Sequence, residues 1–223
     1  MSLKPQDHLK TRSGVNGASY SRHDQSPCYV IQRGEHLSYA GEHHHHAYLL
    51  RSGCVISYVS FEDGKEEIVG LHRPGDILGA EALLGLKAPY SLRAADTANI
   101  QLIHFSRQQL EHCNELKEVK LAFQALHAEV LRLTEMLHID RLPTEQRLAR
   151  FISDFSTRQQ EPVKEPLSIR LPISRRQLAS HLGLAAETLS RSFTSLEKRG
   201  LIRTENHDIS ILDPAELRRF SLR

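Results

Sequence analysis

The sequence predicts an α+β protein with an N-terminal antiparallel β-unit, a long helix and a C-terminal winged helix-turn-helix. Three observations support this: short apolar runs between glycine turns, a heptad repeat after them, and two helices with clear end signals near the C-terminus. The predicted segments are a flexible arm at 1–25, a β-unit at 26–113, a long helix at 114–140 and a helix-turn-helix domain at 141–223.

The β-unit follows a polar arm that shows little apolar pattern. Short apolar runs and turn signals alternate over 28–105, which is typical of an antiparallel barrel or sandwich. The pair Asp63-Gly64 separates the runs Val55–Phe61 and Glu67–Leu71, and it predicts a hairpin.

A heptad repeat predicts that 114–140 is a helix that pairs with a second copy of itself. Its apolar residues are spaced three and four apart without interruption, as in the seam of a coiled coil. The predicted dimer interface consists of Leu116, Val119, Phe123, Leu126, Val130, Leu133 and Leu137. A second stripe, which could pack on the β-unit, consists of Leu121, Ala125, Leu131 and Met136. The alternative is a single amphipathic helix buried in a monomer, which does not require the strict repeat.

Asp140-Arg141-Leu142-Pro143 interrupts the heptad repeat and predicts a hinge. Pro143 opens the next helix, whose apolar face consists of Leu148, Phe151, Ile152 and Phe155. A link with two prolines then leads to a short strand near Leu167–Leu171.

The segment Leu171–Ile202 predicts two helices joined by a tight turn. Ser174 and Gln177 have the spacing of a capping box, and Gly183 ends the helix that they begin. The second helix turns Leu189, Phe193 and Leu196 inward and Glu187, Ser190 and Arg191 outward. Gly200 ends it, and Leu201–Leu212 predicts a two-stranded wing that turns near Asn206–His207. An ordinary helical hairpin is the alternative, but capping, turn and wing in this order favour binding to double-stranded DNA.

The second helix also carries the clearest family resemblance. Glu187-Thr188-Leu189-Ser190-Arg191 resembles the Glu-x-x-Ser-Arg signature of the Crp/Fnr transcription regulators. The match is to the Fnr branch, because the cyclic-AMP receptor branch has glycine where this chain has Ser190. The resemblance implies a jelly-roll of the cyclic-nucleotide-binding type, a homodimer, and an inverted pair of TTGAT-like half-sites. It also implies that the hairpin tip Asp63-Gly64-Lys65 contacts RNA polymerase, as in an activator, although repression stays open.

The residue types in this signature suit base recognition. Arginine can bind a guanine edge bidentately, glutamate can accept from cytosine N4, and a hydroxyl can lie against an A·T pair. Glu187, Ser190 and Arg191 share one helix face and are expected to read one half-site. The full set of expected DNA-binding residues also includes Ser174, Arg175, Arg176 and Thr188. Of these, Arg175 and Arg176 are expected to contact phosphates.

Charge is distributed unevenly along the chain. Residues 141–223 carry 15 Lys and Arg against 10 Asp and Glu, a net +5, whereas 1–140 carry 14 against 17, a net −3. The basic part contains the helix-turn-helix, as a phosphate-binding surface requires. No apolar run approaches membrane-spanning length and no signal segment is evident, so we expect a cytoplasmic protein without a membrane partner.

The resemblance limits what the β-unit could sense, mainly by excluding known ligands of the family. A cyclic-nucleotide site needs Gly-Glu for the ribose and Arg-Ser or Arg-Thr for the phosphate, but this chain has Gly79-Ala80 and Ala88-Pro89. Arg93 lies beyond the phosphate position and is expected on a strand surface. Cyclic AMP is therefore not expected.

An iron–sulfur cluster is not expected either. The oxygen-sensing members supply four cysteines, whereas this chain has no N-terminal triplet and has Gln101 at the place of the fourth. Cys28, Cys54 and Cys113 are also too scattered for a disulfide framework.

The histidines leave a metal or haem role open. Consecutive side chains in His43–His46 cannot all face one ion, so at most His43 and His45 could chelate together. His104 and His112 are candidate axial ligands of haem in a nitric oxide sensor. The cofactor stays unknown, and no metal site is assigned.

Two other function classes fit the sequence less well. A jelly-roll metalloenzyme needs spaced ligands on facing strands, and no catalytic constellation is evident, so we do not expect an enzyme. A ligand-binding module without a promoter function would need the missing nucleotide contacts. We instead expect an event in the β-unit to shift the long helices and re-aim the recognition helices about the hinge.

Overall fold

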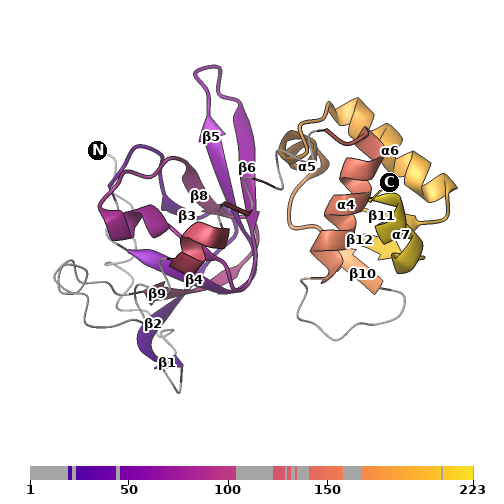
Figure 1. Ribbon diagram of the computed structural model, residues 1–223. Coiled ribbons are helices and arrows are strands. Elements are labelled where there is room, and N and C mark those ends of the chain that lie inside the picture. Colours follow the sequence, from indigo (N-terminus) through magenta and orange to yellow (C-terminus); the bar gives the residue numbers. More distant parts are fainter. Residues whose placement is uncertain are drawn as a thin grey trace. The chain divides into compact units, whose positions relative to one another are not determined.

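The computed structural model describes residues 20–21, 24–43, 46–103, 123–128, 130–131, 134, 141–157, 167–206 and 208–222. The chain divides into two compact units, an N-terminal unit of residues 1–131 and a C-terminal unit of residues 132–223 (Figure 1). Among the described residues, no helix is both long enough and apolar enough to cross a membrane.

The N-terminal unit contains two antiparallel sheets. One has the strand order β1-β2-β9-β4-β7 and the other β3-β8-β5-β6. The strands are β1 Tyr20–Ser21, β2 Asp24–Ile31, β3 His36–Ser38, β4 Ala47–Ser52, β5 Val55–Ser60, β6 Glu66–His72, β7 Ile77–Leu78, β8 Ser91–Ala94 and β9 Ala98–Ile103. A 3-10 helix, η1, spans Ala80–Leu84 between β7 and β8.

Side chains from both sheets form one apolar core. Leu50 and Ile100 come from the first sheet, whereas Val55 and Leu92 come from the second, and all four are at most 1% exposed. Side chains alternate between the two faces of a strand, so this core uses one face of each sheet. The antiparallel sandwich predicted from the turn spacing is confirmed.

The turns that join the strands depend on glycine at two informative positions. Gly64 has φ +77° at the tip between β5 and β6, which confirms the predicted hairpin. Gly53 joins β4 to β5 with φ +83°, and a Cβ there would lie 2.3 Å from the carbonyl oxygen of Thr97. The connection between the two sheets therefore approaches the segment before β9 more closely than any side chain would allow.

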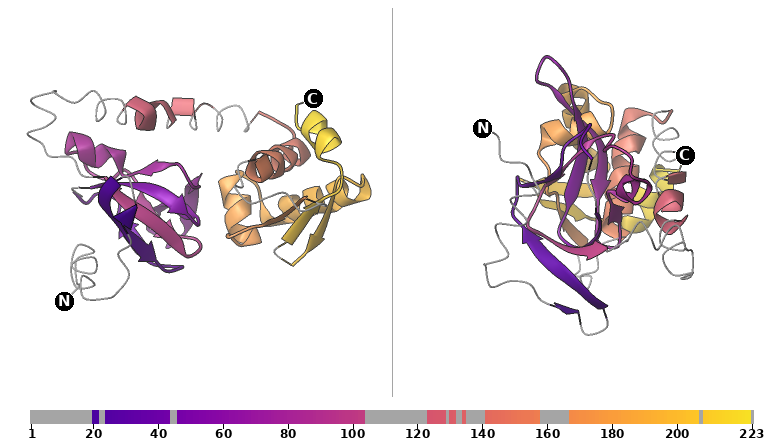
Figure 2. Two further views of the ribbon diagram at one scale, coloured as in Figure 1. Left: turned by 90° about the horizontal axis from the view of Figure 1, so that it is seen from below. Right: turned by 90° about the vertical axis from the view of Figure 1, so that its left-hand side faces the viewer.

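From residue 141 onward, the described part of the C-terminal unit combines four helices with a small sheet. Its elements are α4 Thr144–Thr157, β10 Leu167–Arg170, α5 Arg175–His181, α6 Ala186–Lys198, β11 Ile202–Glu205, β12 Asp208–Ile211 and α7 Pro214–Phe220. The strand order is β10-β12-β11, so the predicted wing pairs with the predicted short strand (Figure 2). The predicted apolar face of α4 is buried, and Leu148 and Ile152 are fully inaccessible.

The long helix is described only in part, and the described residues between 123 and 134 are helical. Phe123, Leu126 and Val130 of the predicted seam are 68%, 61% and 51% exposed. The other predicted seam residues, Leu116, Val119, Leu133 and Leu137, lie outside the described residues. In the second stripe Ala125 is buried and Leu131 is 50% exposed, so the described part of this stripe is only partly covered. The remaining stripe residues, Leu121 and Met136, lie outside the described part of the chain.

Candidate nucleic-acid interface

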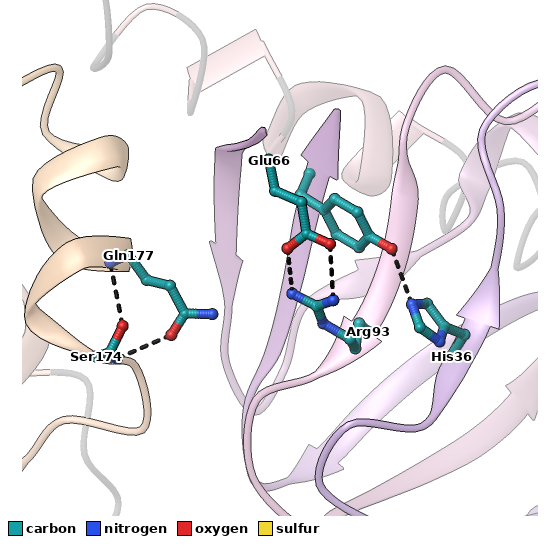
Figure 3. Close-up of polar contacts among 6 residues, drawn as sticks. His36, Glu66, Arg93, Ser174 and Gln177 are labelled. Atoms are coloured by element: carbon teal, nitrogen blue, oxygen red, sulfur yellow. Dashed lines mark hydrogen bonds and ion pairs between the residues drawn. The ribbon is translucent and has the colours of Figure 1, made fainter. Parts of the chain in front are cut away.

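Helix α5 begins at the predicted capping box. The backbone N–H of Gln177 donates to the Ser174 hydroxyl oxygen at 3.2 Å, and the backbone N–H of Ser174 donates to Gln177 Oε1 at 2.9 Å (Figure 3). These two bonds satisfy backbone donors that a helix start otherwise leaves unpaired. The beginning of the helix-turn-helix is therefore fixed locally.

The turn between α5 and α6 is tight and closely packed. Leu178, Ala179 and Leu182 are buried, and the N–H of Leu184 donates to the Ala179 carbonyl at 2.9 Å. Gly183 adopts φ +62° at this turn, the left-handed conformation that favours glycine. The small Ala179 side chain and the glycine turn together let the second helix cross the first at short range, as predicted.

Arg147 of α4 connects this turn to the segment before α4. Its Nε donates to the Leu142 carbonyl at 2.9 Å, and its Nη1 donates to the Leu182 carbonyl at 3.2 Å. Leu142 belongs to the predicted hinge, of which Asp140 lies outside the described residues. The beginning of α4 and the helix-turn-helix are thus held together by one guanidinium.

Helix α6 separates an apolar face from a polar one, as predicted. Leu189, Phe193 and Leu196 are 1%, 6% and 0% exposed. Glu187, Ser190 and Arg191 are exposed, and they follow one another at helix spacings of three and one. The buried face fixes the rotation of α6 about its axis, so the three polar side chains share one accessible surface.

The two consecutive arginines at the start of α5 have different environments. Arg176 is exposed, whereas Arg175 is half-buried with its guanidinium carbon 3.4 Å from the centroid of the Phe193 ring. Burial lowers the pKa of Arg175 from its ordinary value, and the charge of Glu197 opposes this effect. The two arginines that are expected to contact phosphates therefore differ in their exposure to solvent.

The C-terminal end of α6 is held by contacts that sequence reasoning missed. Glu197 Oε1 accepts hydrogen bonds from the backbone N–H and the hydroxyl of Thr204 in β11, at 3.0 and 2.5 Å. Arg199 lies 3.5 Å from Glu145 of α4 and 4.9 Å from the ring centroid of Phe220. Glu197 and Thr204 are seven residues apart and Arg199 and Glu145 are 54 apart, and neither pair follows a local spacing rule that a sequence could show.

In the N-terminal unit, one polar cluster lies on β3, β5, β6 and β8. Arg93 donates to both carboxylate oxygens of Glu66, at 3.0 and 2.6 Å, and its guanidinium lies 4.5 Å from the Tyr58 ring centroid (Figure 3). The Tyr58 hydroxyl lies 2.8 Å from Nε2 of His36. Hydrogen bonding from Arg93 lowers the pKa of Glu66, while burial and then the charge of Arg93 lower the pKa of His36.

The positions considered for an iron–sulfur cluster hold a different arrangement. Gln101 is 2% exposed on β9, and its Oε1 accepts hydrogen bonds from both Nε and Nη2 of Arg51 on β4. Cys28 pairs with Gln101 across the sheet, and Cys54 is buried with its pKa raised to about 12 by desolvation. Cys113 lies outside the described residues. A thiol with this pKa stays protonated at neutral pH, so Cys54 is a poor metal ligand and nucleophile.

The candidate metal ligands are described only in part. His43 forms an isolated β-bridge with Lys87, whereas His44 and His45 lie outside the described residues. The candidate haem ligands His104 and His112 also lie outside them. Within the part of the chain that the structure describes, no three His, Cys, Asp or Glu side chains gather as a metal site would require.

Comparisons with known proteins agree with this architecture. The family described as the Crp-like helix-turn-helix domain matches residues 146–220, and the cyclic nucleotide-binding domain matches residues 30–115. The anaerobic regulatory protein of Haemophilus influenzae is 30% identical over 192 residues, which cover 82% of this chain and 72% of that protein. This chain belongs to the Crp/Fnr family. Like its relatives, it is a transcription regulator whose helix-turn-helix binds DNA.

Further members of the Crp/Fnr family are similar over most of their length. The transcriptional activator protein Anr of Pseudomonas protegens is 29% identical over 196 residues, which cover 84% of this chain and 77% of that protein. The structure of FixK2 from Bradyrhizobium japonicum superposes with a TM-score of 0.75 at 22% identity, over 87% of this chain and 96% of that chain. The predicted fold, a jelly-roll with a C-terminal helix-turn-helix, is confirmed.

The N-terminal domain of this Crp/Fnr protein does not fit a cyclic nucleotide. At the expected phosphate position Ala88 is 3% exposed and offers only a methyl group. Arg93, the nearest arginine in sequence, is neutralised by Glu66 rather than left available as a counter-charge. A buried phosphate without a counter-charge is strongly disfavoured, so the domain keeps the fold without the residues for that ligand.

Proposed function

We propose that this protein binds an inverted pair of TTGAT-like half-sites as a homodimer, with α6 in the major groove. The observation that carries the proposal is the exposed face of α6, where Glu187, Ser190 and Arg191 project from a helix whose opposite face is buried. A rigidly mounted helix with three polar side chains is what direct reading of base edges requires.

The three side chains are assigned by their hydrogen-bonding chemistry. Arg191 donates to the O6 and N7 atoms of a guanine, and Glu187 accepts from a cytosine amino group. Ser190 contacts the neighbouring A·T pair. Arg176 contacts a phosphate, because it is exposed beside the capped start of α5, and Ser174 and Thr188 complete the contacts that set the register.

Fluorescence anisotropy tests the proposal directly. A labelled duplex with two inverted TTGAT half-sites is titrated with the full chain, and a scrambled duplex of the same length and salt is the control. We expect binding to the inverted repeat to be tighter by at least about 10³-fold, the usual margin of specific over non-specific binding. Equal affinity for both duplexes would contradict base reading by α6.

The dimer is proposed from the exposed part of the long helix. Phe123, Leu126 and Val130 leave at least half of their surfaces in contact with solvent in one copy, at the spacing of a coiled-coil seam. A second copy would cover this stripe and place two recognition helices with the symmetry of an inverted repeat.

Sedimentation equilibrium of the 25.3 kDa chain and of a Leu126→Glu variant tests the dimer. The substitution places two like charges at the seam and should weaken dimerisation at least about tenfold. Gln124→Glu adds the same charge at an exposed position off the seam and should leave the dimer intact. An unchanged mass for Leu126→Glu would show that this stripe is not the interface.

The tip between β5 and β6 is proposed to contact RNA polymerase. Asp63, Gly64 and Lys65 are exposed there, and Asp63 and Lys65 form an ion pair at 2.6 Å. A double Asp63→Ala, Lys65→Ala variant should activate transcription in vitro several-fold less while binding the promoter with unchanged affinity. Normal transcription by this variant would remove the tip from the polymerase surface.

A further inference from the structure

Arg175 makes an unusual contact within the helix-turn-helix. It is the first residue of α5, and its guanidinium lies over the ring of Phe193, which is in the second half of α6. The distance of 3.4 Å from the guanidinium carbon to the ring centroid is that of direct stacking. Phe193 is only 6% exposed, so the contact lies between the helices rather than on their outer surface.

The same geometry makes Arg175 a poorer phosphate contact than its exposed neighbour Arg176. Its Nη1 is buried and has no hydrogen-bond partner among the described residues. A phosphate oxygen could reach this nitrogen only if the guanidinium left the Phe193 ring. Arg176, the next residue, is exposed and needs no such rearrangement.

The contact between Arg175 and Phe193 is also placed where it can hold the orientation of α6. The C-terminal end of α6 is held by Glu197 on Thr204 and by Arg199 on Glu145, and Arg175 holds the same half of the helix from the side of α5. Phe193 lies on the buried face, two residues after Arg191 on the exposed face. Because both residues belong to one helix, a rotation of α6 about its axis that displaces Phe193 turns Arg191 by the same angle.

We propose that Arg175 is a positioning residue, which fixes the rotation of α6 through Phe193 and does not itself hold a phosphate. The proposal rests on the proposed function of α6 as the recognition helix. It separates two neighbouring arginines of the same type into different roles: Arg175 supports base preference, and Arg176 supplies sequence-independent affinity.

The test compares matched variants of the full chain, Arg175→Gln and Arg176→Gln, on the inverted-repeat and scrambled duplexes over a range of salt concentrations. Loss of a phosphate contact lowers the slope of log affinity against log salt by about 0.9 per subunit and weakens both duplexes equally. We expect this result for Arg176→Gln. For Arg175→Gln we expect an unchanged slope and a loss on the order of tenfold that is confined to the inverted repeat.

Lysine variants add a second discrimination. Lysine keeps the charge but lacks the planar group that stacks on an aromatic ring. Arg176→Lys should therefore behave nearly as the wild type, whereas Arg175→Lys should lose base preference as Arg175→Gln does. A lower salt slope for Arg175→Gln that Arg175→Lys restores would overturn the proposal, as would an unchanged preference in both Arg175 variants.

The coupling to Phe193 is tested with Phe193→Leu, alone and combined with Arg175→Gln, after thermal unfolding has shown that each variant is folded. Leucine keeps the apolar contact but removes the ring, so the second substitution should add little further loss of base preference. Fully additive losses would contradict action through Phe193. If the wild-type protein bound the inverted repeat and the scrambled duplex equally, the proposed function of α6 would be contradicted. The salt slopes on the scrambled duplex would still show whether Arg175 or Arg176 contacts a phosphate.

Discussion

The two units of this protein use polar side chains in opposite ways. In the N-terminal unit Arg93 binds Glu66 and Arg51 binds Gln101, so charged and polar groups satisfy one another within the sheets. On α6 of the C-terminal unit, Glu187, Ser190 and Arg191 point to solvent from a helix that is buried behind them. The polar groups of these sheets thus bind one another, whereas those on this face of α6 are exposed to solvent.

This difference explains why the partner of one unit is evident and the signal of the other is not. Base edges are fixed donors and acceptors, so side-chain types at helix spacing indicate the ligand that they fit. Arg93 with Glu66 and Arg51 with Gln101 are instead paired with each other within the N-terminal unit. Neither the cyclic-nucleotide nor the iron–sulfur residues of the family are available there to indicate a ligand.

The largest predicted effect is at Arg191. Replacing it with alanine should cost about 1–3 kcal/mol of binding free energy in each half-site and relax the preference at the paired guanine. Arg170→Ala, which removes an arginine that is 80% exposed on β10, is the matched control for loss of charge alone. The measurement is anisotropy on duplexes that carry single substitutions at each position of the half-site.

The dependence of the variant's affinity on the base sequence of the duplex distinguishes a base contact from a phosphate contact. If Arg191→Ala weakened every duplex by the same factor, Arg191 would be a phosphate contact and the comparison between the units would lose its basis. Glu187→Ala should relax preference at the cytosine instead, and an unaltered base preference would contradict that assignment.

A second prediction concerns a substitution that should destabilise the N-terminal unit alone. Gly53→Ala places a Cβ 2.3 Å from the Thr97 carbonyl oxygen at φ +83°, so we expect a destabilisation of about 2–4 kcal/mol from overlap and backbone strain together. Gly34→Ala is the control, because φ is +87° but nothing lies within 4 Å of the new Cβ. Its cost should be about 1 kcal/mol.

Tyrosine fluorescence measures this effect selectively. All six tyrosines lie between residues 20 and 90, and the chain has no tryptophan. The tyrosine transition should therefore shift to lower temperature in Gly53→Ala, while far-UV circular dichroism still records helices of the C-terminal unit. Equal shifts for Gly53→Ala and Gly34→Ala would show that the close approach to Thr97 is not limiting.

The features that could be predicted from the sequence are those that depend on interactions between residues close together in the chain. The capping box of Ser174 and Gln177 and the hairpin at Asp63-Gly64 each depend on residues within a few positions, and both are confirmed. The apolar faces of α4 and α6 depend on a single helix period and are also confirmed. The strand order of the two sheets depends on pairings such as Cys28 with Gln101, which no local pattern contains.

In the candidate site, too, features set by one helix period were predicted and contacts between distant residues were not. The exposure of Glu187, Ser190 and Arg191 follows from the period of α6 and was predicted. The placement of Arg175 on Phe193 joins residues eighteen positions apart in two helices, so charge type alone suggested a phosphate contact instead. Leu131 shows the converse, since an apolar residue in a plausible stripe is exposed.

A third prediction concerns the start of α5. Ser174→Ala removes the acceptor for the Gln177 N–H and should lower the stability of the C-terminal unit by about 1 kcal/mol. Ser168→Ala, at an exposed position on β10, is the matched control and should change stability by less than about 0.5 kcal/mol. Thermal unfolding followed by far-UV circular dichroism measures both. Equal stability of the two variants would mean that tertiary packing rather than the cap fixes this helix.

The smallest predicted effect is a pH dependence of the N-terminal unit. Burial and Arg93 lower the pKa of His36 below its ordinary value of 6.5, so the unfolded chain takes up this proton first as the pH falls. Stability should therefore fall as the pH drops below about 6.5 and level off below the pKa of the folded state. Glu66, whose pKa is lowered from 4.5, should contribute a separate loss at more acidic pH.

Denaturant unfolding followed by tyrosine fluorescence between about pH 7.5 and 3 separates the two groups. His36→Gln should flatten the dependence near pH 6 while leaving the more acidic loss, whereas Glu66→Gln should do the reverse. His127→Gln, at an exposed helical position, is the control for removing a histidine. If His36→Gln kept the wild-type slope, the paired groups of this sheet would not be as closely matched as their distances indicate, and the contrast with the open face of α6 would weaken.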